Sequence, residues 1–419
     1  MLVVLTNIPT PYRTAFFNVL NDLLKNVDID FHVIYCAKTE PGRFWEFQPE
    51  ENSYNYTFLS GWHPTFNKIY PHFNFGLLKT LQKLKPKYLL VAGSWNSPAT
   101  INVLLNKKKI NSKIIFWSEG HQDAQRSNNK LINFVRNKVF KSFDAFVVPN
   151  NKSKLYIKKF NSNAPIGFLP NTIDEDFYQL NQCTNIESLK NKYNFKKLSR
   201  TFICIATLSD RKGVFELIQA YNLLDVEDKK NTGLVFVGIG ELLEKLTDYK
   251  NEFKLDNVYI LGHQPKEVVK ELLSICDIFI LPTKQDPNPL SPIEASFMKK
   301  PLVISNFAGN FQELIVLNKN GLILNEISAV CINEALKYFI NKSDSELREM
   351  GEFSYLNANR LFLRNKAAKS LIDFLYEAKS AKKYISVSFY LDKTKLINFF
   401  CFSHFSSGEM YFLLNCKLP

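Results

Sequence analysis

Residues 281–297, LPTKQDPNPLSPIEASF, bring acids, hydroxyls and prolines together between a run typical of a buried strand and one typical of a helix. The prolines fix the backbone and hold the loop extended. The letters SPIE predict a helix start, with Ser291 as N-cap, Pro292 at the first helical position and Glu294 three residues after the cap. A helix N-terminus offers free N–H groups and the positive end of a dipole, which suits phosphate. The alternative interpretation is a simple capping box, with Asp286 as an ordinary turn residue.

Two further loops carry groups that suit a diphosphate. LSDRKG follows the strand-like run TFICIAT and places Arg211 and Lys212 ahead of a predicted helix. GIGE follows GLVFVG, and its small residues Gly238 and Gly240 would let a ligand approach the backbone. Cations, glycines and a helix N-terminus at the ends of neighbouring strands therefore predict a diphosphate site. Each signal has an ordinary alternative, because a lysine at a helix start is usually solvated and GxG is common in loops.

The elements that must position these loops alternate between short apolar runs and amphipathic stretches. Helical patterns near 12–25, 97–108 and 128–140 accompany the strand-like runs IDFHVIYC, KYLLVAG, KIIFWSE and DAFVVPN. The alternation then restarts with TFICIAT, GLVFVG, NVYILG, DIFILPT and PLVIS. This pattern predicts an α/β chain of two doubly wound parallel-sheet domains, in which ligands bind beyond the carboxyl ends of the strands. The expected divisions are an N-terminal domain, a polar connector, a C-terminal domain and an unassigned tail, over residues 1–180, 181–199, 200–380 and 381–419.

Length and composition agree with two globular domains. The chain has 419 residues, of which 46% are hydrophobic and 14% aromatic, so it can bury a large core. No apolar run is as long as a membrane span and no basic leader precedes LVVLT, so we expect neither an integral membrane protein nor a signal peptide. The seven cysteines lie far apart without paired spacing. They predict buried thiols in a reducing cytoplasm rather than a zinc site or disulfides.

The formal charge of +13 lies mostly in the N-terminal half. Residues 1–180 hold 22 Lys and Arg against 13 Asp and Glu, whereas residues 181–380 hold 26 against 25. A basic surface suits anionic lipid, nucleic acid or a phosphorylated substrate. The alternative is a purely compositional effect of a sequence rich in Asn, Lys and Ile. The lysine clusters of this half are Lys83, Lys85 and Lys87, and Lys107, Lys108 and Lys109.

Three residues of the N-terminal half are candidates for the interdomain cleft. Arg13 follows PTPY after the first strand and could meet phosphate, although a solvated helix-start residue is the alternative. Glu119 and His121 follow IIFWS at a strand end, where ligands of such sheets bind, although Glu-Gly-His is also a common turn. His63, in GWHP, fits a structural role better than a catalytic one.

The second half of the chain resembles the C-terminal domain of retaining glycosyltransferases of family 4, which have the GT-B fold of two facing Rossmann-like domains. The similar segments are LSDRKGVFELIQAY, LVFVGIGELLEKL, NVYILGHQPKEVVKELLSICDIFILPT, residues 281–297 and AGNFQELIVLNKNGLIL. Upstream, NIPTPYRTAFFNVL, YLLVAGSWNSPA, IIFWSEG and FLPNTIDEDFY are similar to the N-terminal domain of one bacterial branch of that family. The resemblance implies that the last helix, before residue 380, packs back on the N-terminal domain.

The resemblance also assigns roles. The family's two acids with seven residues between them fall on Asp286, where Glu is usual, and on Glu294. In such enzymes the second acid holds the ribose hydroxyls and the first contacts the transferred sugar. The family lysine falls on Lys212, but the arginine five residues earlier is Thr207 here, so Arg211 is our candidate replacement. The residues implied to lie against the donor's sugar and phosphates are Asn288, Pro289, Leu290 and Ser291.

The implied reaction moves a sugar, with retention of configuration, from a nucleotide sugar to a saccharide acceptor. Arg211, Lys212, Asp286 and Glu119 are the catalytic candidates. Arg13, Gly238 and Gly240 join the donor site, and His121 the acceptor side. Cations and a helix dipole replace a metal in such a mechanism, so we expect no cofactor and interpret the DED at 174–176 as structural.

The implied pathway class is bacterial surface polysaccharide synthesis, such as lipopolysaccharide or capsule. A lipid-linked acceptor and weak peripheral association with the anionic inner face of the membrane would explain the basic half, and we expect no nucleic acid partner. Two alternatives stay open: a soluble acceptor, and a degenerate nucleotide-sugar binder disabled by the departures at Thr207 and Asp286. A nicotinamide oxidoreductase is disfavoured, because NIPTPYR lacks GxGxxG after the first strand.

Overall fold

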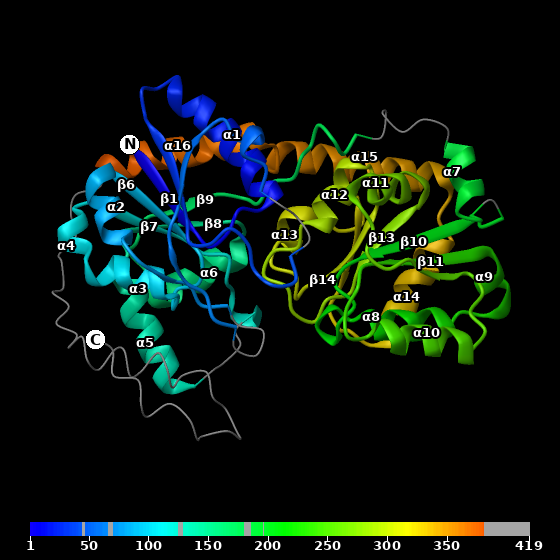
Figure 1. Ribbon diagram of the computed structural model, residues 1–419. Helices are drawn as coiled ribbons and strands as arrows, with labels where there is room; N and C mark the ends of the chain where they lie inside the picture. Colours follow the sequence, from blue (N-terminus) through cyan, green and yellow to red (C-terminus); the bar gives the residue numbers. More distant parts are fainter. Residues whose placement is uncertain (44–46, 66–69, 125–128, 180–185, 196, 381–419) are drawn as a thin grey trace.

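The computed structural model describes residues 1–380 apart from 44–46, 66–69, 125–128, 180–185 and 196. Two α/β domains lie side by side, each a parallel sheet with helices on both faces (Figure 1). The predicted tail, residues 381–419, lies outside the described residues, as do Cys183, Cys401 and Cys416. Among the described helices, none combines the length and the apolar character needed to cross a bilayer.

The N-terminal domain is built on a seven-stranded parallel sheet in the order β3-β2-β1-β6-β7-β8-β9. Every residue of β1 and β6 is buried, as expected for strands covered on both faces. The strands are β1 Leu2–Thr6, β2 Phe31–Tyr35, β3 Asn55–Phe58, β6 Tyr88–Ala92, β7 Lys113–Trp117, β8 Ala145–Val148 and β9 Ile166–Phe168. A short antiparallel hairpin consists of β4 Gly61–Trp62 and β5 Phe73–Asn74.

The alternation of side chains along each strand divides this domain into two cores. Leu2 and Val4 pack with α1 and α16 on one face, and Val3 and Leu5 pack with α2, α3, α5 and α6 on the other. The helices are α1 Pro11–Lys25, α2 Leu77–Leu84, α3 Pro98–Leu105, α4 Lys107–Ile110, α5 Lys130–Lys141 and α6 Asn151–Phe160.

The C-terminal domain has a six-stranded parallel sheet in the order β12-β11-β10-β13-β14-β15 and one continuous core. The strands are β10 Arg200–Ile205, β11 Thr232–Val237, β12 Val258–Ile260, β13 Ile278–Leu281, β14 Leu302–Ser305 and β15 Gly321–Leu324. The segment expected to be a polar connector contains α7 Ile186–Lys192, whose Ile186 and Leu189 pack against this core. The other helices are α8 Val214–Asn222, α9 Val226–Asn231, α10 Leu243–Glu252, α11 Lys266–Ile275, α12 Ser291–Phe297, α13 Phe311–Leu314, α14 Ala329–Ile340 and α15 Asp344–Leu361.

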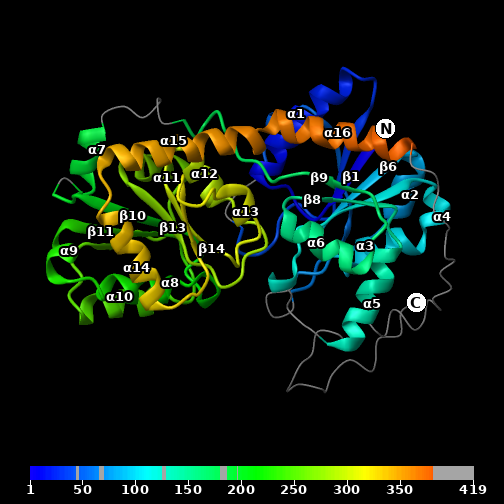
Figure 2. The same ribbon diagram turned by 180° about the vertical axis from the view of Figure 1, so that it is seen from behind.

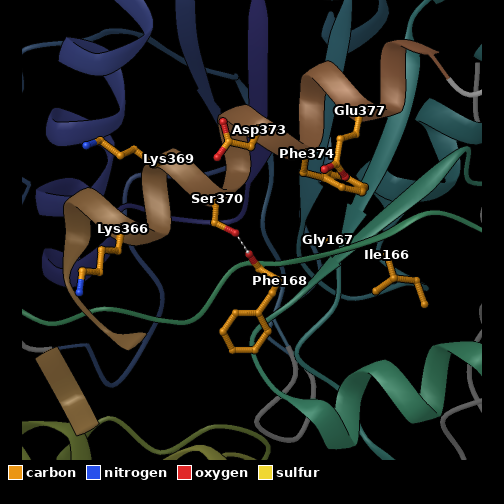
Figure 3. Close-up of a pocket in the computed structure, with 9 residues that line it drawn as sticks. All are labelled: Ile166, Gly167, Phe168, Lys366, Lys369, Ser370, Asp373, Phe374 and Glu377. Atoms are coloured by element: carbon orange, nitrogen blue, oxygen red, sulfur yellow. Dashed lines mark hydrogen bonds between the residues drawn. The ribbon is translucent and has the colours of Figure 1, made fainter. Parts of the chain in front are cut away.

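The chain then crosses back to the first domain. After α15, the helix α16, Arg364–Ser380, returns to cover α1 and β9, so α15 and α16 together run along both domains (Figures 1 and 2). The hydroxyl of Ser370 donates a hydrogen bond of 2.7 Å to the carbonyl oxygen of Phe168 in β9 (Figure 3). Arg364, where the chain returns to the N-terminal domain, forms ion pairs with three acids that follow β9, where the chain first leaves that domain. These acids are Asp174, Glu175 and Asp176.

Candidate functional site

The order of the C-terminal sheet brings two of the predicted loops together. β10 has β11 on one side and β13 on the other, so the connections leaving β10 and β13 turn to opposite faces of the sheet and leave an opening between them. Open α/β sheets bind ligands at such a switch point. The loop after β10 carries Arg211 and Lys212, and the loop after β13 begins at Pro282 and runs to α12. We call residues 282–290 the β13 loop.

Lys212 and Asp286 form a nearly buried ion pair across this opening. The Nζ atom of Lys212 donates a hydrogen bond to Oδ2 of Asp286, and the two side chains are 11% and 9% exposed. The other carboxylate oxygen of Asp286 accepts a bond of 3.2 Å from the backbone N–H of Asn288. Asp286 therefore fixes both the lysine and the bend of the β13 loop.

The predicted cap of α12 is wrong. Leu290 is the N-cap residue and its side chain makes no capping bond, while Ser291 is already helical. The helix starts one residue early because Leu290 has helical backbone angles, and the hydroxyl of Ser291 donates 2.9 Å to the carbonyl oxygen of Ile205 at the end of β10. α12 is thus held against β10 rather than capped by its own serine.

Glu294 lies on α12, half-buried behind this loop. Burial raises the pKa of its carboxyl group to about 7, and the hydroxyl of Tyr178, which donates a hydrogen bond to it, opposes that rise. Hydrogen bonds donated by hydroxyl groups stabilise the ionised form of such a buried carboxylate. The geometry suits the ribose role that the resemblance implies.

The remaining C-terminal candidates lie at the rim. Arg211 is exposed, and its guanidinium donates 2.7 Å to the carbonyl oxygen of Gln285 in the β13 loop. Gly238 and Gly240 follow β11, and a Cβ atom there would lie 1.9 Å from the carbonyl oxygen of Ala206 and 2.3 Å from that of Leu208. These glycines let two loops approach each other, a structural reason that the sequence interpretation did not include.

The N-terminal candidates Arg13 and Glu119 meet each other. The guanidinium of Arg13 donates 3.1 Å to the carboxylate of Glu119 and 2.8 Å to the hydroxyl of Thr6, and it lies 4.8 Å from the ring centroid of Trp117. The side-chain amide of Asn171 donates 3.1 Å to the same oxygen of Glu119. The carboxyl ends of β1 and β7 are thereby joined in one polar cluster.

His121 links this side to the β13 loop. Its Nε2 lies 3.2 Å from the carbonyl oxygen of Asp286, so Nε2 carries the hydrogen and Nδ1 is the basic nitrogen. Burial lowers the pKa of His121, and the neighbouring Lys152 lowers it further. Within the described residues Nδ1 has no hydrogen-bond partner, and Oδ2 of Asp123 lies 3.7 Å from it.

Asn150, at the end of β8, makes the second link between the domains. Its side-chain amide donates 3.2 Å both to the carbonyl oxygen of Pro287 and to Oδ1 of Asn288. Gly309 makes room for this approach, since a Cβ there would lie 1.8 Å from the Pro287 oxygen. The Nζ atom of Lys152 donates hydrogen bonds to Asp123 in its own domain and to the carbonyl oxygen of Asn306 in the C-terminal domain.

Three predicted features lie outside this cluster. His63 hydrogen-bonds His72, which in turn bonds Glu40, so it fits the structural role expected. The DED carboxylates are engaged by Arg364 at the crossing between the domains. In the lysine clusters, Lys107 donates to Asp144 and to the Ser142 carbonyl, and the exposed members are Lys83, Lys85, Lys87, Lys108 and Lys109.

The sequence interpretation does not single out Asn150, Asn171, Tyr178 or Lys152. The available signal is positional: Asn150 is the last residue of the strand-like run DAFVVPN, where a polar side chain reaches the same edge as Glu119. Asn171 and Tyr178 belong to LPNTIDEDFY, which the sequence interpretation treats only as a structural loop.

Taken together, these groups suit an anionic, hydroxyl-rich ligand. The exposed guanidinium of Arg211 supplies positive charge, the charge of Lys212 is shared with Asp286, and Glu294 supplies a hydroxyl acceptor. Buried polar atoms without a partner in the described structure lie on both sides: Nε of Arg13, Nδ1 of His121, Oδ1 of Asn171, Nδ2 of Asn288 and Oδ1 of Asn310. Among the described residues, no group of three or more His, Cys, Asp or Glu is placed to hold a metal ion.

A separate hollow of about 450 Å³ lies between β9 and α16 (Figure 3). It is lined by Phe168, Lys366, Lys369, Asp373 and Phe374, among others. None of its lining residues belongs to the cleft cluster, so we do not assign the hollow to the same site.

Sequence comparisons point to glycosyltransferases. Residues 185–355 match the family described as glycosyl transferases group 1. An uncharacterised glycosyltransferase of Methanocaldococcus jannaschii is 27% identical over 320 residues, which cover 73% of this chain and 71% of that protein. TuaC of Bacillus subtilis, provisionally named as a teichuronic acid biosynthesis glycosyltransferase, is 27% identical over 164 residues, 38% of this chain and 39% of TuaC.

Solved structures share the fold. HepE of Anabaena, in complex with UDP and glucose, has a TM-score of 0.70 at 14% identity, covering 90% of this chain and 100% of HepE. WaaG, a glycosyltransferase involved in lipopolysaccharide biosynthesis, has a TM-score of 0.64 at 16% identity, covering 88% of this chain and 99% of WaaG. The chain has the GT-B fold, and the family match with these relatives supports a GT-B glycosyltransferase.

Proposed function

We propose that this protein is a retaining hexosyltransferase that moves a sugar from a nucleoside diphosphate sugar to a lipid-linked saccharide. The observation that carries the proposal is the ion pair of Lys212 and Asp286 at the switch point of the C-terminal sheet, where the Asp286 carbonyl contacts His121 of the other domain. The same loop leads into α12, which carries Glu294. UDP and glucose bind the structurally similar HepE, which makes a nucleotide sugar the natural candidate donor.

The chemistry follows from charge. As the bond between the anomeric carbon and the donor's phosphate oxygen breaks, negative charge grows on the leaving diphosphate. The ammonium of Lys212 and the guanidinium of Arg211 lie where they can stabilise it. The acceptor oxygen forms its bond to the same face of the sugar, and its proton passes to the leaving phosphate. This route needs no separate general base and no metal ion.

The remaining groups position substrates. Ionised Glu294 would accept hydrogen bonds from the ribose hydroxyls. Asp286 holds Lys212 and shapes the β13 loop, which would lie against the sugar. Nδ1 of His121 would accept a hydrogen bond from a sugar hydroxyl. Arg13 and Glu119, which belong to the same domain as His121, would lie across from the β13 loop.

A lipid-linked acceptor is the part of the proposal that uses the basic half. Residues 1–180 carry a net positive charge, and most of the exposed lysines of the two clusters would face an anionic membrane. The relatives named for teichuronic acid and lipopolysaccharide biosynthesis act on surface polymers, so we place this protein in bacterial surface polysaccharide synthesis.

The test begins with a panel of nucleotide sugars, scored by protection against thermal unfolding. A true donor at a hundred times its Kd adds about 2.7 kcal/mol to the free energy of unfolding. Slow hydrolysis of that donor should then release sugar with the anomeric configuration retained, as read by NMR. Inverted product would refute the retaining mechanism. Protection without hydrolysis or transfer would favour the non-catalytic binder, and no protection by any donor would refute the proposal.

A further inference from the structure

The outward side of α5 combines exposed apolar side chains with lysines. Leu131 and Phe134 are each 55% exposed, and they lie one turn apart. Lys130, Lys138 and Lys141 are exposed and lie four or seven residues from Phe134, hence on the same side of the helix. The Nζ atom of Lys138 lies 4.5 Å from the Phe134 ring centroid. We call these five residues the α5 ridge.

The charge of this helix has one sign. The sequence of α5, KLINFVRNKVFK, contains no acidic residue. Its arginine, Arg136, is turned inward, where it is buried beside the Trp95 ring. The exposed positive charge therefore comes from lysines that flank the two apolar side chains, an arrangement typical of helices that lie in a membrane interface.

The C-terminal end of α5 is buried in a core, and the outer side of the helix is exposed in the described structure. Val139 and Phe140, near its C-terminal end, are buried in the core beneath the sheet, whereas Leu131 and Phe134 belong to none of the cores of the described residues. Figures 1 and 2 show α5 extending beyond the body of the N-terminal domain, on the opposite side of the sheet from α1 and α16.

The ridge continues onto neighbouring elements. Lys107 of α4 donates hydrogen bonds to the Ser142 carbonyl and to Asp144, so α4 lies beside the C-terminal end of α5. Lys108 and Lys109 on α4 are exposed, and Leu105 at the end of α3 is 43% exposed. An extended surface with the same chemistry therefore borders the ridge.

The geometry points to a membrane surface as the occupant: the α5 ridge docks on a bilayer that contains anionic lipid, with Leu131 and Phe134 entering the interface and the lysines facing lipid phosphates. Charge complementarity selects this partner, because lysines around apolar anchors match an anionic, apolar interface. α5 starts nine residues after His121 in the chain. The inference rests on the proposed function for its purpose, which is to hold the acceptor-side loop near a lipid-borne substrate.

The decisive measurement is flotation of the full chain with two kinds of vesicle, phosphatidylcholine alone and phosphatidylcholine with phosphatidylglycerol. The wild type should float only with the anionic vesicles, and less as salt rises. The double variant Leu131→Ser, Phe134→Ser should bind roughly tenfold or more weakly. Leu356→Ser is the matched control, because Leu356 is 61% exposed on α15 of the other domain, and it should bind like the wild type.

Insertion itself has a separate readout. Relative to the wild type, the Phe134→Trp variant should gain fluorescence that shifts to shorter wavelength on anionic vesicles and is quenched by brominated lipid. If the double variant floats like the wild type, or if the added fluorescence of Phe134→Trp does not respond to vesicles, the inference is wrong. If the double variant instead abolishes a concentration-dependent dimer and the wild type ignores vesicles, the ridge is a contact between two copies.

Failure of this inference and failure of the proposed function can be told apart. The double variant should keep donor protection and donor hydrolysis at wild-type levels, since neither involves α5. A protein that binds vesicles through α5 but no nucleotide sugar would refute the proposed function alone. Normal donor hydrolysis without vesicle binding would refute the ridge alone.

Discussion

The side chain of Asn150 both caps α6 and contacts the other domain, and substitutions can separate these two roles. Its Oδ1 accepts 2.8 Å from the backbone N–H of Ser153 and caps α6, while its Nδ2 bonds the β13 loop of the other domain. Asn150→Ser keeps a capping oxygen, because serine is as good an N-cap as asparagine, but it removes the interdomain donor. Asn150→Ala removes both.

The expected magnitudes follow from those contacts. The two interdomain bonds are long, at 3.2 Å each, so we assign them the low end of the usual range, about 0.5 kcal/mol apiece. Losing about 1 kcal/mol lowers the ratio of molecules with this interdomain contact to molecules without it roughly fivefold. If transfer requires the contact, kcat/KM should therefore fall by up to about fivefold, and equally in both variants. Only Asn150→Ala should also lose the cap, worth about 1 kcal/mol, which lowers Tm by about 2–4 °C.

The assay is initial-rate transfer or donor hydrolysis, paired with thermal unfolding. Asn151→Ala is the matched control, because Asn151 bonds Gln312 across the same boundary at 3.0 Å but in an exposed position, where water replaces the bond. It should leave kcat/KM nearly unchanged. If kcat/KM falls in Asn150→Ala but not in Asn150→Ser, Asn150 acts only as a helix cap. If neither variant changes kcat/KM, the interdomain contact has no part in turnover.

Three further predictions concern the donor side. Because burial raises the pKa of Glu294 to about 7, donor affinity should strengthen as pH rises toward that value and level off above it, and Tyr178→Phe should move the midpoint upward. Below that pH the folded state holds a proton that the unfolded chain, with the ordinary pKa of 4.5, has released. Thermal stability should therefore fall as pH rises from about 4.5 to about 7, and Glu294→Gln should abolish both pH effects. Lys212→Met should lower the free energy of unfolding by about 3–5 kcal/mol, because it leaves the buried Asp286 carboxylate unpaired. The double variant Lys212→Met, Asp286→Asn should regain most of the Tm but none of the activity. Equal Tm values in the single and double variants would show that the pair is not buried. Activity should survive excess EDTA, and loss that magnesium or manganese restores would overturn the metal-free mechanism.

The fold was largely predictable because its strands carry strong local signals. LVVLT and KYLLVAG are almost entirely apolar, which is typical of a sheet covered on both faces, and their alternation with helices favours parallel pairing. β9, with three residues and a glycine in its centre, has no such signal and was missed. The helix α7 was also missed, since its short polar sequence gives little indication that Ile186 and Leu189 pack on a core.

The site was predictable as a set of loops but not as a set of contacts. Lys212 and Asp286 were both expected at strand ends, yet only the fold shows that they neutralise each other. The cap predicted at Ser291 failed because Leu290 already has helical backbone angles, so Ser291 lies inside the first turn, and its hydroxyl donates instead to the Ile205 carbonyl, 86 positions away. The contacts of Asn150 likewise join residues more than a hundred positions apart, and no local pattern encodes such a distance.

The return of α16 has a consequence for how this protein is made. Leu371, Phe374 and Leu375 of α16 are buried in the core of the N-terminal domain, so that domain consists of two stretches of chain with the whole C-terminal domain between them. During synthesis β1–β9 leave the ribosome first, but the apolar face that α16 covers stays open while roughly 200 more residues are added, about 10–40 s at ordinary elongation rates. The C-terminal domain can complete its core during that delay. The half that is synthesised first is therefore finished last, and its uncovered strands are the part of the nascent chain that depends most on chaperones.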